Sequence, residues 1–87
     1  MKVVKIPIDV LAWTDKDGSI HPIRFRMEMD DGSYATIKIN KVSSSESIKQ
    51  AGEPVIIYRC QSIIDYIEKI FELRYLPIEC KWVLWKI

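Results

Sequence analysis

The stretch that most constrains the fold is Pro22–Val42, whose side chains alternate as those of two paired strands do. In its first arm, Phe25 and Met27 are separated by charged residues, and successive side chains of a strand point to opposite faces. The second arm alternates in the same way around Ile37. Asp30–Ser33 lies between the arms and contains Asp-Gly, a strong hairpin signal. The stretch is therefore predicted to be a β-hairpin with one apolar and one charged face.

Other segments have strand-like composition and are separated by turn signals. They are Val3–Trp13, Pro54–Ile64, Phe71–Tyr75 and Cys80–Ile87. Because Pro7 has no N–H, the first of them is predicted to be an edge strand or to turn the nitrogen of Pro7 outward at a bulge. The polar, serine-rich segment Ser43–Glu53 shows no alternation and is predicted to be a loop.

The segment Ile63–Leu76 fits two interpretations. As a helix it would place several isoleucines on one face, with Ser62 as the N-cap residue. As two strand segments it would turn at Asp65-Tyr66, and Phe71–Tyr75 would alternate between apolar and charged side chains. The strand interpretation is preferred because the surrounding sequence is rich in strand-forming residues.

These patterns predict an all-β fold for a single domain that covers residues 1–87. About six antiparallel strands are expected in a small SH3- or OB-like barrel or a two-sheet roll, because closure removes exposed strand edges from so short a chain. The alternative is an α+β fold with a helix near residues 62–73.

Composition excludes a general electrostatic attraction to an anionic partner. Thirteen basic residues against 12 acidic ones leave a net charge of +1, so such a partner has to be bound by a local patch. The sequence shows no signal peptide and no apolar run long enough for a bilayer, which predicts a cytoplasmic protein and no membrane partner. Cys60 and Cys80 are then expected to be reduced, as two buried packing residues that could be cross-strand neighbours.

No residue pattern predicts catalysis, a metal site or a cofactor. His21 is the only histidine, and together with Cys60 and Cys80 it has neither the number nor the spacing of zinc ligands. The segment Asp15–Ile20 has some likeness to a calcium loop, but carboxylates are missing from the first and last ligand positions. The sequence therefore predicts a binding module without catalytic residues.

Two surfaces are candidates for binding. A sheet face with basic and aromatic side chains can follow a phosphate backbone and stack bases, which predicts weak, sequence-tolerant nucleic-acid binding. The residues expected to form it are Arg24, Arg26, Tyr34, Lys38, Arg59 and Arg74. In the alternative, Trp82 and Trp85 of the doubly apolar final strand form a protein-interaction or homodimer interface, where tryptophan is enriched.

The set of segments that the chain combines is also similar to known small proteins. It consists of PIRFRMEMDDGSYATIKI, YRCQS, FELRY and CKWVLWKI. Together they resemble short uncharacterised all-β proteins of Gram-positive, clostridia-like bacteria. In strand pattern alone they resemble small β-domains of unknown function encoded near error-prone polymerase genes. The resemblance implies a strand at Phe71–Tyr75, a cytoplasmic bacterial setting and a link to nucleic-acid transactions, and it supplies no catalytic residues.

Overall fold

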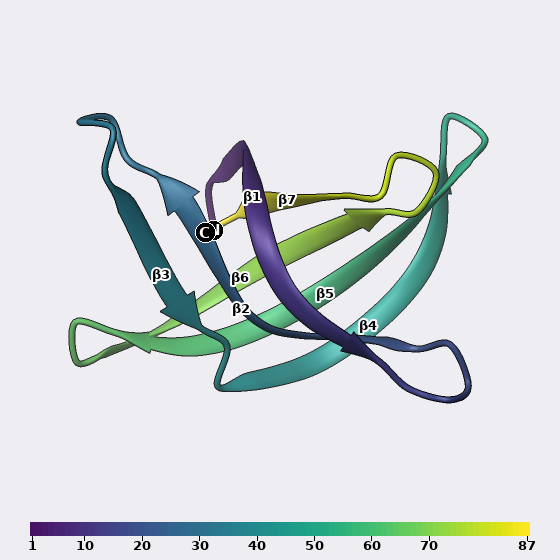
Figure 1. Ribbon diagram of the computed structural model, residues 1–87, viewed down its shortest axis with the longest axis horizontal. Helices are drawn as coiled ribbons and strands as arrows, with labels where there is room; N and C mark the ends of the chain where they lie inside the picture. The colour runs from purple at the N-terminus through teal and green to yellow at the C-terminus, as the bar shows by residue number, and fades with distance from the viewer.

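The computed structural model describes all 87 residues and folds them into seven strands without any helix. The strands are β1 (Val3–Thr14), β2 (Ile20–Glu28), β3 (Tyr34–Lys38), β4 (Lys41–Gln50), β5 (Glu53–Ile64), β6 (Ile67–Leu76) and β7 (Lys81–Lys86). All pairings are antiparallel, and the strand order β3-β2-β1-β7-β6-β5-β4 curls into a half-barrel (Figure 1). No helix of a length and apolarity suited to crossing a membrane is present.

Strand β1 joins the two halves of the sheet. Its first part, Val3–Ile8, pairs with β7, whereas its second part, Asp9–Thr14, pairs with β2. Pro7 lies where β1 has no partner on the β2 side, so the missing N–H is tolerated there. The prediction of an edge strand is therefore wrong for β1 as a whole. The pairing of β1 with β7 shifts register between Val3 and Ile6, just before Pro7, and Lys5 has a φ of 49° there.

The core lies between the two halves, on the concave face of the curled sheet. Phe25 of β2 and Phe71 of β6 are almost fully buried, and their ring centroids lie 5.4 Å apart. The hydroxyl of Tyr58 donates a hydrogen bond of 2.9 Å to the carbonyl oxygen of Ile20, which ties β5 to the start of β2. The remaining buried members of this core are Ile39, Cys60, Leu73 and Leu84.

The all-β prediction is confirmed, and the alternative helix near residues 62–73 is wrong. These residues belong to β5, to β6 and to the tight turn between them. Asp65 and Tyr66 make that turn with φ values of 51° and 65°. β5 and β6 pair with each other, which provides hydrogen-bond partners for their backbone N–H and C=O groups. This pairing outweighs the helical spacing of the isoleucines.

The strand count is seven rather than six because the segment predicted as a loop forms a strand. Residues of Ser43–Glu53 lie largely in β4, which pairs along β5 from Lys41↔Gln61 to Gln50↔Glu53. β4 is an edge strand, and nearly all of its side chains are exposed. A serine-rich sequence with no apolar alternation is consistent with an edge strand whose two faces are both exposed to solvent.

The two cysteines lie in different environments. Cys60 is fully buried in the core, and burial raises the pKa of its thiol to about 12. Cys80 is exposed in the turn before β7, where its thiol donates to the carbonyl oxygen of Pro77. The predicted burial is therefore correct for Cys60 and wrong for Cys80, and both thiols are free.

Candidate functional site

The outer face of strands β1, β2 and β3 carries a group of cationic side chains. Arg24 of β2 lies opposite Leu11 of β1 on one side and opposite Lys38 of β3 on the other. Two positions along β2, Arg26 lies opposite Asp9 and Thr36. Side chains at alternate positions of paired strands share a face, so these groups are neighbours on one surface. We call this surface, which also includes Tyr34 of β3, the basic face.

Arg26 is held in a fixed position. Its Nε donates a hydrogen bond of 2.7 Å to the carboxylate of Asp9, and its guanidinium lies 4.7 Å from the ring centroid of Tyr34. The hydrogen bond to Asp9 and the negative charge of that carboxylate raise the pKa of Arg26. One charge of the basic face is thus already neutralised, while the guanidinium stays exposed and oriented.

Arg24 and Lys38 have no such neutralisation. They lie directly opposite each other on neighbouring strands, and neither forms a salt bridge or a side-chain hydrogen bond. Like charges at directly opposed positions of a sheet are destabilising. This pair therefore leaves a local positive potential that an anion would relieve.

A shallow, open cavity of about 400 Å³ lies beside Arg24 of this pair. Its polar groups are the cationic Arg24 and Arg26, the anionic Asp9 and the hydroxyl-bearing Thr36, and Leu11 contributes an apolar side chain. Guanidinium and hydroxyl groups are donors to anionic oxygens. Because Asp9 is paired with Arg26, the hollow combines hydrogen-bond donors with the unpaired positive charge of Arg24 at a place that solvent and ligands reach.

Two of the predicted basic residues lie elsewhere. In the sheet order, Arg74 of β6 is separated from β2 by strands β1 and β7, and Arg59 of β5 by β6 as well. The curl of the sheet also brings β5 next to β3, where Ser62 donates a hydrogen bond to the carbonyl oxygen of Lys38, but the guanidinium of Arg59 is engaged elsewhere. Arg59 and Arg74 both contact Glu72, which is 3% exposed, at 3.6 Å and 3.0 Å respectively. They neutralise a buried carboxylate, so the structure groups Arg24, Arg26, Tyr34 and Lys38 and leaves Arg59 and Arg74 outside the basic face.

The two predicted interface tryptophans point to opposite faces of β7 and have intramolecular partners. Trp82 packs against the core between Tyr58 and Tyr75, at centroid distances of 5.3 Å and 4.8 Å. The guanidinium of Arg74 lies over Trp85, with its central carbon 3.9 Å from the centroid of the Trp85 ring. Their role in a protein interface stays a prediction.

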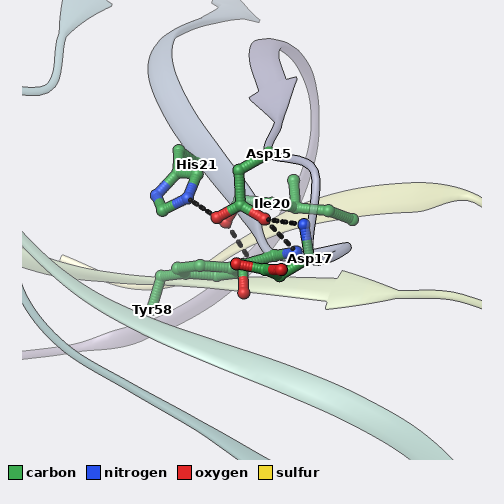
Figure 2. A network of polar contacts seen from close by, with 6 residues as sticks. Asp15, Asp17, Ile20, His21 and Tyr58 are labelled. Atoms are coloured by element: carbon green, nitrogen blue, oxygen red, sulfur yellow. Dashed lines mark hydrogen bonds and ion pairs between the residues drawn. The ribbon is translucent and has the colours of Figure 1, made fainter.

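Sequence reasoning gave no role to the aromatic stack next to the basic face. Trp13 of β1 and His21 of β2 lie opposite each other, with ring centroids 4.2 Å apart and an interplanar angle of 21°. Asp15 accepts a hydrogen bond of 2.9 Å from the His21 ring (Figure 2). The sequence does contain an indication of this stack. Trp13 and His21 lie on either side of a short turn, so pairing of the two strands makes them neighbours.

Asp15 is a turn residue that also positions His21. Its carboxylate accepts hydrogen bonds from the backbone N–H groups of Asp17 and Ser19. The hydrogen bond with His21, and then that from Ser19, lower the pKa of Asp15. The segment with some likeness to a calcium loop therefore uses this carboxylate within the turn, and no group of three or more His, Cys, Asp or Glu side chains forms a metal-binding arrangement.

Comparisons with known proteins do not assign the chain to a family. No protein-family model, no curated protein and no solved structure matches it. A function has to be inferred from the geometry of the chain itself.

Proposed function

We propose that the protein binds nucleic acid weakly and without sequence preference, through phosphate contacts of the basic face. The observation that carries the proposal is the unneutralised pair of Arg24 and Lys38, directly opposed across β2 and β3. Repulsion within this pair makes a bound phosphate group more favourable than solvent at that position.

The hollow next to the pair supports the same ligand. Arg26 is oriented by Asp9 and Tyr34, so its remaining N–H donors are presented with little loss of side-chain freedom on binding. Thr36 adds a hydroxyl at the same hollow. These donors fit the oxygens of a phosphodiester. Because binding of this kind does not require contacts to base edges, we expect it to show no sequence preference.

The number of cations sets the expected strength. Arg24, Arg26 and Lys38 are three basic groups, of which Arg26 already has an acidic partner. For a single-stranded ligand, two to three phosphate contacts correspond to a slope of about −1.4 to −2 when the logarithm of the binding constant is plotted against the logarithm of the salt concentration. Binding is therefore expected in the weak, non-specific range of roughly 10⁻⁴ M near physiological salt, and stronger at low salt.

The curvature of the sheet also supports the proposal. Small OB-like barrels bind nucleic acid on a curved sheet face that carries basic and aromatic side chains. Because the shape and the surface chemistry are similar, we propose that nucleic acid lies across the curved sheet as it does on SH3- or OB-like barrels.

The test is fluorescence anisotropy with labelled oligonucleotides at low and physiological salt. The variant Arg24→Ala/Lys38→Ala is compared with Lys2→Ala/Lys49→Ala, which removes the same charge from exposed positions off the basic face. The first variant is expected to bind at least tenfold more weakly at low salt, with a salt slope flatter by about 1.4. The second is expected to stay close to the parent protein.

Two outcomes contradict the proposal. One is no binding by the parent protein even at low salt. The other is equal weakening by both double variants, which would show that net charge matters and the basic face does not.

A further inference from the structure

The stack of Trp13 and His21 has one solvent-facing side. Trp13 is 52% exposed although it packs on the imidazole of His21 with ring centroids 4.2 Å apart. A tryptophan that is half exposed while one face of its ring is supported can accept a second planar group on the other face. Nothing in the core requires this arrangement, because Trp13 and His21 are not members of the core cluster.

The support under Trp13 is rigid. His21 Nε2 lies 2.9 Å from the carboxylate of Asp15, and two backbone N–H groups fix that carboxylate in turn (Figure 2). The adjacent carbonyl of Ile20 accepts the hydrogen bond from the hydroxyl of Tyr58, at 2.9 Å. The base of the β1–β2 turn is therefore tied to β5, and the indole loses little freedom when a ligand stacks on it.

This stack lies on the same surface as the basic face. The pairing of β1 with β2 shifts register between Leu11 and Ala12, but Leu11, which lies opposite Arg24, and Trp13 are both about half exposed, whereas Ala12 between them is less exposed. Leu11 and Trp13 therefore share the outer face. At the other end of β2, Tyr34 lies opposite the acidic Glu28, and one side of its ring faces the guanidinium of Arg26. From His21 to Glu28 the strand covers roughly 20 Å, so the cations lie between an indole at one end and a phenol ring at the other.

We propose that the ligand of the basic face is a single strand, whose unpaired bases stack on Trp13 and Tyr34 while its phosphates contact the cations between them. This inference rests on the proposed function. In a duplex the faces of the bases are already stacked on one another, so the two rings would find no partner. Stacking also tolerates any base, because every base has a flat aromatic face.

The test compares three labelled ligands of equal length: a single strand, the same strand without bases, and a duplex. The variants are Trp13→Leu and Tyr34→Leu, and Trp13→Phe retains a ring for stacking. Tyr66→Leu is the control, because Tyr66 is fully exposed at the β5–β6 turn and off the basic face. Circular dichroism and thermal unfolding of each variant verify that the fold is retained.

The two leucine variants are expected to bind the normal single strand about five- to tenfold more weakly, at the lower end of what one stacked base contributes. Trp13→Leu is expected to bind the base-free strand and the duplex as the parent protein does. Tyr34→Leu also removes the ring that orients Arg26, so it is expected to weaken binding of these two ligands, but by less than it weakens binding of the normal single strand. Trp13→Phe is expected to be intermediate, and Tyr66→Leu to match the parent protein. Equal weakening toward the normal and base-free strands, or no weakening at all, overturns the stacking inference.

The result also distinguishes this inference from the proposed function. Binding of the base-free strand that depends on Arg24 and Lys38 would keep the phosphate proposal intact even if both leucine variants bound normally. Failure of the parent protein to bind any of the three ligands overturns both.

Discussion

The contact between Phe25 and Phe71 is expected to hold the strands of the basic face against the rest of the sheet. Of the four aromatic pairs in the protein, this is the one that joins β2 to β6. The two rings are 1% and 0% exposed, and they meet at an angle of 60° with centroids 5.4 Å apart. Tilted aromatic pairs of this kind contribute about 0.5–1.5 kcal/mol beyond the area that they bury.

The perturbation is a double-mutant cycle of Phe25→Leu and Phe71→Leu. Each substitution removes part of a fully buried ring and leaves a small void, so each is expected to lower the free energy of unfolding by about 1–2 kcal/mol. The double variant is expected to lose less than the sum, with a coupling energy of about 0.5–1.5 kcal/mol, because the ring–ring contact is lost only once. A loss of 1 kcal/mol corresponds to about 4–8 °C in Tm for a domain of this size.

The assay is urea unfolding followed by circular dichroism, with the slope m compared among variants to verify a common unfolded state. Phe71→Leu with Ile48→Val serves as the control cycle, because Ile48 lies on β4 and is not part of the core cluster. That cycle is expected to be additive within about 0.3–0.5 kcal/mol. A coupling of the same small size for Phe25 and Phe71 would refute the packing of β2 on β6 described above.

Two further predictions concern ionisable groups. Hydrogen bonds from His21 and Ser19 lower the pKa of Asp15 from its ordinary value of 3.8, so this carboxylate stabilises the fold above that value and ceases to do so as the pH falls through its folded pKa. Asp15→Asn is therefore expected to lower Tm at neutral pH but to match the parent protein in strong acid, and a Tm difference that persists in acid would contradict this. Burial raises the pKa of the Cys60 thiol to about 12, so a thiol reagent at mildly alkaline pH is expected to label Cys80 alone in the native protein and both cysteines in urea. Labelling of two thiols at equal rates without denaturant would show that Cys60 is accessible.

The sequence was a good guide wherever the relevant pattern is local. Alternation in Pro22–Val42 predicts the hairpin of β2 and β3, and it places Arg24, Arg26 and Lys38 on one face. The alternation in Phe71–Tyr75 likewise predicts part of β6. Each of these conclusions needs only the two-residue period of a strand and a turn sequence.

Other features depend on partners far away in the chain. The serine-rich β4 has a weak strand signal of its own and is held by its pairing with β5. The isoleucines of Ile63–Leu76 have helical spacing, yet the β5–β6 turn places several of them in solvent, including Ile63 and Ile67. The helical alternative would have placed these side chains on its apolar face, so local periodicity alone could not choose between the two interpretations.

The composition of the candidate site shows the same division. By itself the sequence determined which side chains of β2 and β3 share a face, because a strand fixes the direction of each side chain relative to its immediate neighbours. Only the tertiary structure decided that Arg59 and Arg74 contact the buried Glu72 instead of joining that face, and that Trp13 and His21 stack beside it. Strand order and cross-strand register are set by the packing of the whole core, so no short stretch of the sequence contains them.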